Sequence, residues 1–300
     1  MSDFFNNGWA IFVGAATVLG LLGCLWLLWV ASKRRPMAAD NSTGHVFDED
    51  LVEMNNPLPR WWMILFVLTV VFAFGYVVAY PGLGSMAGQL GWTSKNQLAA
   101  EQQAAGRAMD TVYADLKGVP AERLSRNPKA MAIGERLFIN NCAACHGSDA
   151  KGSKGFPNLT DTDWLHGGSP EKIEESITAG RQGMMPPMAA AVGTAEDVHN
   201  VAHYVLSLSG SANNSIAAAA GRSKFAACAA CHGVDGKGNL AIGSPNLTDR
   251  IWLHGWGEDA IVDMVTHGKT NVMPAQAGRL TPEQIHVLAA YVWNLSKSTL

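Results

Sequence analysis

The string Cys-Ala-Ala-Cys-His-Gly occurs twice in this chain, at residues 142–147 and again at 228–233. C-x-x-C-H is the attachment pattern of c-type haem. In that chemistry each thiol adds to a haem vinyl group, and the adjacent imidazole ligates the iron from the proximal side. The sequence therefore predicts two covalently bound haems c. The expected thioether cysteines are Cys142 with Cys145 and Cys228 with Cys231, and the expected proximal ligands are His146 and His232.

Two other uses of paired cysteines compete with this interpretation. A redox-active C-x-x-C motif normally belongs to a thioredoxin-like βαβ unit, and no such pattern surrounds either motif. Two C-x-x-C pairs could also form a zinc site, but the histidine that follows each pair would then be a coincidence. Haem attachment explains both histidines, so we favour it.

The similarity between the two regions extends beyond the motifs. Pro-Asn-Leu-Thr-Asp at 157–161 recurs at 245–249, and Trp-Leu-His-Gly at 164–167 recurs at 252–255. Both pairs are offset by 88 residues, whereas the cysteines are offset by 86. A repeat of this kind indicates a duplicated structural unit, here one haem-binding unit with a two-residue difference in one loop.

The same alignment predicts the sixth iron ligand. Met185 and Met273 occupy equivalent positions, and each precedes a proline. A thioether is a soft, neutral ligand that raises the potential of haem iron. Met184 remains the alternative at the first position. Ligation within each repeat is the default expectation, although an exchange between the repeats would use the same two methionines.

Other repeated residues suggest supporting roles. Pro157 and Pro245 either offer a carbonyl to the proximal histidines, a contact that orients such ligands, or simply form turns. The remaining pairs are expected near haem propionates or in purely structural or solvated positions: His166 with His254, and Arg181 with Lys269.

Helical patterns flank each motif. Gly134 and Phe138 precede the first motif and Gly221 and Phe225 the second, and closing helices are expected at 196–208 and 282–296. This arrangement resembles class I cytochromes c, in which a glycine and an aromatic residue on the first helix cross an aromatic residue on the last. The resemblance implies a small all-α fold around each haem, with Tyr204 and Tyr291 on the closing helices.

Two uncharged apolar runs, 9–31 and 61–80, precede the repeats. About 20 apolar residues cross a bilayer as a helix, and the first run is too long and too weakly basic at its start for a cleaved signal peptide. Lys33, Arg34, Arg35 and Arg60 lie between the runs, so the positive-inside rule places this loop in the cytoplasm. The N-terminus and the repeats then face the periplasm, where haem is attached to such motifs in bacteria.

These observations define an expected order of segments and exclude one class of partner. The segments are 1–31, the first membrane helix; 32–60, the cytoplasmic loop; 61–80, the second membrane helix; 81–129, a periplasmic helical linker; and 130–210 and 211–300, two tandem cytochrome c domains of an all-α protein. After residue 81 the 18 basic residues nearly balance the 19 acidic ones. The sequence has no stripe of basic residues that would indicate nucleic-acid binding.

Two further strings are specific to one family. NNPLPRWW at 55–62 and YPGLGSMAGQLGWTS at 80–94, together with two haem units, closely resemble the membrane-anchored di-haem subunit, the CcoP or FixP type, of cbb3-type cytochrome c oxidases. The resemblance covers the chain from about residue 45. The helix at 9–31 departs from the many members that have one span, which leaves its role open.

That resemblance implies an electron-input subunit in the bacterial inner membrane. It would accept electrons from a soluble periplasmic cytochrome c and pass them to a mono-haem subunit and a catalytic haem–copper subunit, which reduces oxygen and pumps protons. The chain itself would not reduce oxygen, because two six-coordinate irons leave no open position. The alternatives are a di-haem cytochrome serving another dehydrogenase or oxidase, a di-haem peroxidase, and a gas sensor, although no signalling domain is visible.

Overall fold

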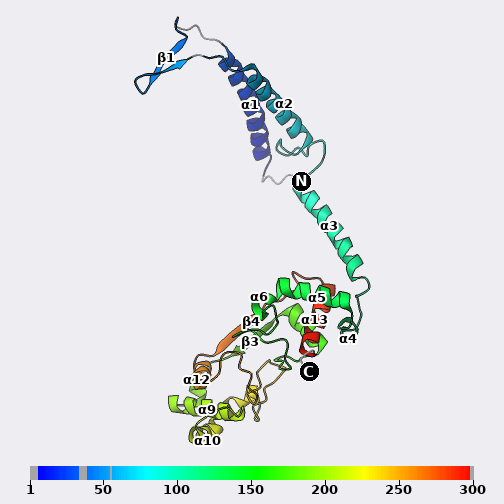
Figure 1. Cartoon of the computed structure of the whole chain (residues 1–300), viewed down its shortest axis with the longest axis vertical. Helices are drawn as coiled ribbons and strands as arrows, with labels where there is room; N and C mark the ends of the chain where they lie inside the picture. The colour runs from blue at the N-terminus through cyan, green and yellow to red at the C-terminus, as the bar shows by residue number, and fades with distance from the viewer. Residues whose placement is uncertain (1–5, 34–38, 55, 298–300) are drawn as a thin grey trace. The chain divides into compact units, whose positions relative to one another are not determined.

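The computed structural model describes residues 6–33, 39–54 and 56–297, and it divides the chain into two units that meet at Asp110 (Figure 1). The first unit holds two long helices, a β-hairpin and most of a third helix. The second holds both repeats, and its regular elements among the described residues are helices apart from two short strands. Each unit is described by itself below.

In the first unit, helices α1 and α2 coincide with the two apolar runs. Helix α1 spans Asn7–Ser32 and α2 spans Arg60–Ala79. Both are long and apolar enough to cross a membrane, as predicted from the sequence. Gly84, in the loop after α2, has a φ of +62°, and a Cβ atom there would lie 2.2 Å from the Ala10 carbonyl oxygen. Glycine at this position therefore lets the loop pack directly against the first turns of α1.

The region between α1 and α2 contains two strands that the sequence analysis did not predict. Strand β1, Ser42–Phe47, pairs antiparallel with β2, Leu51–Met54. Helix α3 follows α2 over Ser94–Tyr113, within the segment 81–129 that was expected to be a helical linker. Arg34 and Arg35, which contribute to the predicted orientation, lie outside the described residues.

In the second unit each repeat contributes the same series of elements. The first comprises α5 Pro128–Asn141, α6 Ala143–His146, α7 Pro170–Ala179, β3 Arg181–Met185 and α9 Ala195–Leu208; short helices α4 Ala121–Leu124 and α8 Ala189–Val192 accompany them. The second comprises α10 Ser215–Lys224 continued by the 3-10 turn η1 Phe225–Ala227, then α11 Ala229–His232, α12 Glu258–His267, β4 Lys269–Met273 and α13 Pro282–Lys297. The local signals are repeated as well. Asn127 and Asn214 each cap a first helix by accepting two backbone N–H groups, as N-cap side chains do.

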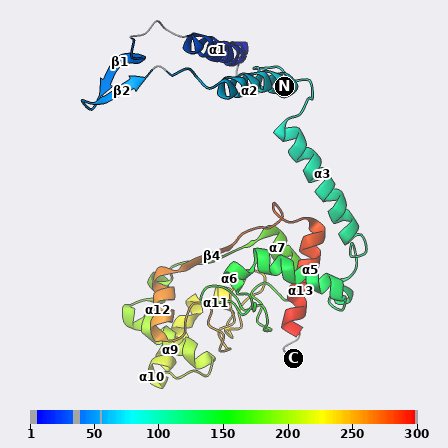
Figure 2. The ribbon, with the colours of Figure 1, turned by 45° about the horizontal axis from the view of Figure 1, so that its top comes forward.

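The closing helices are exchanged between the repeats. Helix α5 of the first repeat packs against α13 of the second, and α9 of the first packs against α10 of the second (Figure 2). The expected aromatic crossings form between these exchanged partners: Phe138 contacts Tyr291 with ring centroids 5.9 Å apart, and Tyr204 contacts Phe225 at 5.2 Å. The expectation that each repeat closes on its own last helix is therefore wrong.

The short connection between α9 and α10 gives a physical reason for the exchange. Only residues 209–214 link the two helices, and Ser211 N–H donates to the Leu206 carbonyl within that turn. Helices joined by so short a link pack as an antiparallel pair at little loop-closure cost. Lys224 also pairs with Asp197 at 3.0 Å across the two helices. Once α10 occupies the face of α9, the face of α5 is left for α13.

Two separate apolar cores result. One contains Phe138, Ile173 and Ile177 of the first repeat with Leu280, Ile285, Leu288 and Val292 of the second. The other contains Val198, Val201, Val205 and Leu206 of the first repeat with Phe225, Ile261 and Val265 of the second. Each core thus encloses side chains from both repeats, so a methionine of one repeat can lie beside the motif of the other.

Candidate haem-binding sites

Each proximal histidine is held by the carbonyl that the sequence pointed to. His146 Nδ1 lies 3.0 Å from the Pro157 carbonyl oxygen, and His232 Nδ1 lies 3.1 Å from that of Pro245. A carbonyl oxygen only accepts, so Nδ1 carries the hydrogen in both rings. The lone pair of Nε2 is then free for a metal, and the ring is fixed in orientation.

The leading cysteine of each motif is half-buried and packs on one of the two apolar cores. Burial and the neighbouring Cys145 raise the pKa of Cys142 to about 11. Burial and Cys231 likewise raise the pKa of Cys228. A redox-active cysteine needs a lowered pKa, so neither thiol has the electrostatic setting of a thioredoxin-like centre. Among the described residues, no group of three or more His, Cys, Asp or Glu side chains could hold a metal ion.

A two-stranded ribbon carries the methionines across from one repeat to the other. Strands β3 and β4 run antiparallel, with Arg181 opposite Met273 and Met185 opposite Lys269 (Figure 1). The glycines that end α7 and α12 make this crossing possible. Gly180 and Gly268 have φ values of +73° and +72°, and a Cβ atom on either would lie 2.3 or 2.5 Å from the carbonyl oxygen of Met273 or Met185.

Because of this crossing, each methionine lies beside the motif of the other repeat. Met273 packs on the core that also contacts Cys142 and Trp164. Met185 packs on the core that contacts Cys228 and Trp252. A cavity of about 330 Å³ places Met185 in the same wall as Cys228, Cys231 and His232. The default expectation of ligation within a repeat does not fit this arrangement.

The position of Met184 bears on the alternative that the sequence left open. Met184 also touches the cavity, but its side chain is 71% exposed. It alternates with Met185 along β3 and points to the opposite face of the ribbon. Met185 is therefore the better placed of the two toward His232.

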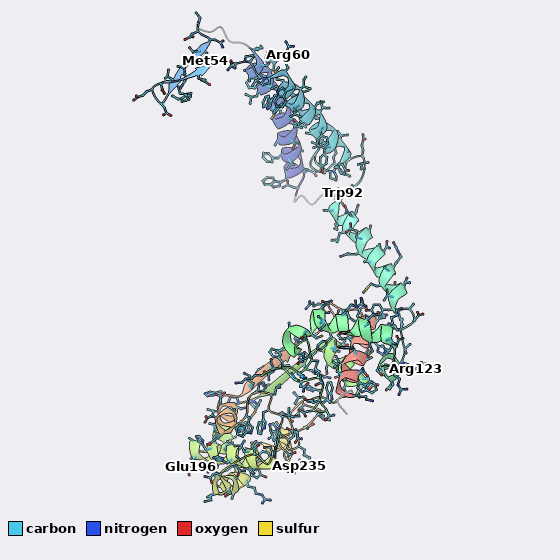
Figure 3. The ribbon with its side chains drawn as sticks, viewed as in Figure 1. Met54, Arg60, Trp92, Arg123, Glu196 and Asp235 are labelled. Carbon is cyan, nitrogen blue, oxygen red and sulfur yellow. The ribbon has the colours of Figure 1, made fainter. Side chains whose placement is uncertain are left out.

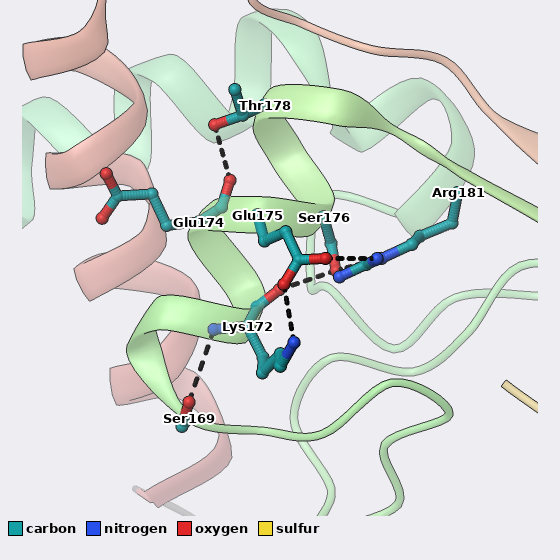
Figure 4. Close-up of polar contacts among 7 residues, drawn as sticks. All are labelled: Ser169, Lys172, Glu174, Glu175, Ser176, Thr178 and Arg181. Atoms are coloured by element: carbon teal, nitrogen blue, oxygen red, sulfur yellow. Dashed lines mark hydrogen bonds and ion pairs between the residues drawn. The ribbon is translucent and has the colours of Figure 1, made fainter. Parts of the chain in front are cut away.

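Two buried polar atoms point to an absent acceptor. Arg181 donates through Nε to the Ser176 hydroxyl at 2.9 Å and through Nη1 to Glu175 at 2.8 Å, yet its Nη2 finds no partner among the described residues (Figure 4). Trp252 lines the cavity, and its buried indole N–H also finds no hydrogen-bond partner among the described residues. Buried donors in native proteins are rarely left unpaired. The carboxylates of a macrocycle bound beside each motif would supply acceptors for these donors. Trp252 lines the cavity beside the second motif, whereas Arg181 is not among the residues that line it.

The other repeated side chains take different positions. His254 Nε2 accepts from the Asn271 amide at 2.9 Å. His166 packs so closely against the loop of the other repeat that a Cβ atom on Gly243 would lie 2.2 Å from its ring. His166 thus joins the two repeats, whereas His254 bonds within its own repeat, and both contacts agree with a structural role. Lys269 is exposed, unlike its counterpart Arg181.

Sequence reasoning missed a group of carboxylates in the same cavity, formed by Asp161, Asp163 and Asp249. Burial and the charge of Asp249 raise the pKa of Asp161, and burial with the charges of Asp249 and Asp161 raises that of Asp163. The recurrence of Asp161 at Asp249 in the repeat was the available signal. It was not informative alone, because proximity across the two repeats follows only from their packing.

Two protein-family models match this chain. The family described as the N-terminal domain of cytochrome oxidase-cbb3, FixP, matches residues 39–87. The family described as cytochrome c oxidase, cbb3-type, subunit III matches twice, at 129–205 and 217–292. The double match coincides with the two repeats.

Several curated relatives are similar over most of their length. The cbb3-type cytochrome c oxidase subunit CcoP of Rubrivivax gelatinosus is 62% identical over 299 residues, which cover 100% of this chain and 98% of that protein. The subunit FixP of Azorhizobium caulinodans is 42% identical, with 85% and 92% covered. The subunit CcoP of Cereibacter sphaeroides is 36% identical, with 85% and 94% covered.

Proposed function

Because this chain belongs to the cbb3-type cytochrome c oxidase subunit III family, we propose that it carries single electrons from a soluble periplasmic cytochrome c to the mono-haem and catalytic subunits of that oxidase. It is a cytochrome subunit of the oxidase, with haem c as its class of cofactor and two candidate membrane helices near its N-terminus. The number of haems, their ligands, the donor and the receiving subunits are parts of the proposal.

The observation that carries the proposal is the position of one methionine beside each haem motif. We assign Cys142, Cys145, His146 and Met273 to one haem, and Cys228, Cys231, His232 and Met185 to the other. Bound haem c supplies a one-electron couple, and a histidine and a thioether on its iron favour the reduced state relative to two histidines.

The chain's own groups then do three things. The cysteines tether the macrocycle, the Pro157 and Pro245 carbonyls hold each imidazole with Nε2 toward the iron, and the two apolar cores exclude water. Arg181 Nη2 and Trp252 Nε1 are suited to donate to haem propionates. An iron ligated by both a histidine and a methionine would suit electron transfer and leave no position for oxygen, so we place oxygen reduction in the catalytic subunit.

The proposed orientation rests on charge. Lys33, Arg34, Arg35 and Arg60 lie between α1 and α2, and basic loops stay in the cytoplasm. The N-terminus and both haem-binding sites would then face the periplasm of a bacterial inner membrane. Attachment of haem to C-x-x-C-H motifs in the periplasm supports the same orientation.

A pair of variants tests both the haem count and the crossed ligation. Replacing Cys228 and Cys231 by Ala should leave a single covalent haem, bound at Cys142 and Cys145. In that background Met273→His should lower the potential of the remaining haem by roughly 100 mV or more, because an imidazole replaces the thioether. Met185→His should leave it unchanged.

The measurements are haem stain per polypeptide and a spectroelectrochemical titration of the purified chain. Retention of two haems in the cysteine variant would contradict the attachment sites. A shift with Met185→His in place of Met273→His would show ligation within each repeat. Electron-input function is tested separately, by oxygen uptake of the intact oxidase with reduced cytochrome c as donor, where the cysteine variant should be severely impaired.

A further inference from the structure

The hairpin β1–β2, between the two candidate membrane helices, exposes apolar side chains on both faces. Val46 pairs with Val52 and Phe47 with Leu51. All four are between 46% and 65% exposed, and Met54 is 48% exposed (Figure 3). Nine of the ten strand residues are exposed, and only Ser42 is half-buried. A cluster of this kind is unusual on a surface that meets only water.

A hairpin of this size does not hold itself together. Two isolated strands are at best marginally stable in water, and a third strand or a packed layer is normally required. The turn adds to the cost, because Asp48 and Glu49 have φ values of 47° and 69°. Non-glycine residues in this left-handed region each cost on the order of 1 kcal/mol or more. The hairpin therefore needs a binding surface to be stable.

The two faces of the hairpin differ in chemistry. Alternate residues of a strand point to opposite sides, so Val46, Val52 and Met54 share one face. The other face is mixed. There the Thr43 hydroxyl donates to Glu53 at 2.8 Å, and the rings of His45 and Phe47 stack at 5.2 Å. The face of Val46, Val52 and Met54 carries a single small polar side chain, that of Ser42 opposite Met54, and we call it the apolar hairpin face.

Charge selects among the surfaces that could cover this face. Residues 40–54 carry five acidic side chains and no Lys or Arg: Asp40, Asp48, Glu49, Asp50 and Glu53. The cytoplasmic leaflet of a membrane is itself anionic and attracts basic segments, so it would repel this hairpin. The cytoplasmic loops of membrane proteins are enriched in Lys and Arg and would attract it.

We propose that the apolar hairpin face docks on the basic cytoplasmic surface of a membrane-embedded partner subunit of the same oxidase. The proposal rests on the orientation given above, which places the hairpin in the cytoplasm. The match to the FixP N-terminal family starts at residue 39, three residues before β1, and continues through α2. The hairpin thus belongs to the segment by which the family is recognised, and α1 lies outside it.

Site-specific cross-linking in the assembled oxidase tests the contact directly. A benzophenone side chain at position 52, on the apolar hairpin face, should form an adduct that mass spectrometry identifies as an integral membrane subunit of the oxidase. The same group at His45, on the opposite face, should give several-fold less of it. Equal yields from both positions, or adducts at position 52 only with lipid, would overturn the proposal.

A variant series tests whether the contact contributes to assembly. Val46→Ser with Val52→Ser should reduce recovery of the partner subunits with the tagged chain at least several-fold in mild detergent. Phe47→Ser with Leu51→Ser is the matched control and should reduce it less. Asp48→Lys with Asp50→Lys should weaken recovery further as the attraction to a basic surface is reversed. Unchanged recovery in the first and third variants would contradict the proposal.

Haem stain of each variant shows whether the chain itself has folded, since the haem motifs lie in the other unit. A cysteine placed at Asp50 and labelled from one side of the membrane reports the orientation. Labelling from the periplasm would refute the orientation in the proposed function. Labelling from the cytoplasm without the expected adduct would refute only the docking.

Discussion

At the scale of single residues, the hydrogen-bond partners of His286 favour its protonated, charged form. Its Nδ1 lies 2.8 Å from a Glu174 oxygen on α7, and its Nε2 lies 2.8 Å from the Val119 carbonyl oxygen. The carbonyl only accepts, and so does the Glu174 carboxylate when ionised, so these two contacts favour the cationic imidazole with hydrogen on both ring nitrogens. Burial alone would lower the pKa of His286, but the bonds to Val119 and Glu174 outweigh it and raise the pKa.

The sign of this shift gives a pH prediction. Because the folded-state pKa is raised, the stabilisation is complete below the ordinary value of 6.5 and is lost as the pH rises through the folded-state pKa. The melting temperature of the purified chain should therefore fall as the pH rises above about 6.5, and His286→Gln should flatten that fall. His267→Gln is the control, since His267 forms only an exposed pair with Asp263. An identical slope in wild type and His286→Gln would contradict the assignment.

At the scale of secondary structure, two helix crossings depend on a glycine at the point of contact. A Cβ atom at Gly134 of α5 would lie 2.5 Å from Cβ of Tyr291 on α13. The equivalent position, Gly221 of α10, meets the backbone of α9, where a Cβ atom would lie 2.0 Å from the Asn200 carbonyl oxygen. Gly134 therefore packs against the Tyr291 side chain and Gly221 against the backbone of α9, and neither crossing leaves room for a methyl group.

Gly134→Ala should accordingly destabilise the haem-binding unit. Forcing a methyl group into a packed crossing costs about 1–3 kcal/mol, which chemical denaturation followed by haem absorbance would measure. Gly106→Ala is a matched control within a helix, because nothing lies within 4 Å of a Cβ atom at Gly106. Alanine there should be neutral or slightly stabilising. Equal effects of the two substitutions would show that the crossing is not tight.

These elements also mark the limit of what the sequence could predict. Residue types specify that Gly134 and Phe138 need an aromatic residue on a closing helix, and the two C-x-x-C-H motifs, the prolines and the methionines were all found by spacing. The identity of the partner was not predictable, because Tyr204 and Tyr291 belong to equivalent repeats and suit the site equally. The length of the 209–214 connection decides between them. The hairpin was missed because its strands are short and its turn lacks the usual glycine.

At the scale of the whole haem-binding unit, the exchange means that neither repeat encloses a core alone. The core around Cys142 takes Leu280, Leu288 and Val292 from the end of the chain. The core around Cys228 takes Val201 and Val205 from the first repeat. A fragment ending at residue 210 would keep His146 but lose α13 and Met273.

Fragments therefore should not behave as two independent cytochromes. Residues 111–210 and 211–300, each exported alone to the periplasm, should fail to give a stable haem protein with a sulfur ligand, whereas co-export should restore both through association of the two pieces. Absorbance spectra and size-exclusion chromatography distinguish these results. Two separately folded, monomeric fragments with low-spin haem would contradict the exchange.

The ribbon of β3 and β4 has a consequence for the ancestry of the molecule. After the duplication, the strand that leaves each half came to complete the other half, with Gly180 and Gly268 marking the points of crossing. With this arrangement, deleting or replacing one repeat would also remove part of the core that the other repeat needs. Duplicated genes usually drift apart or lose a member, but here geometry itself ties the survival of one copy to the survival of the other.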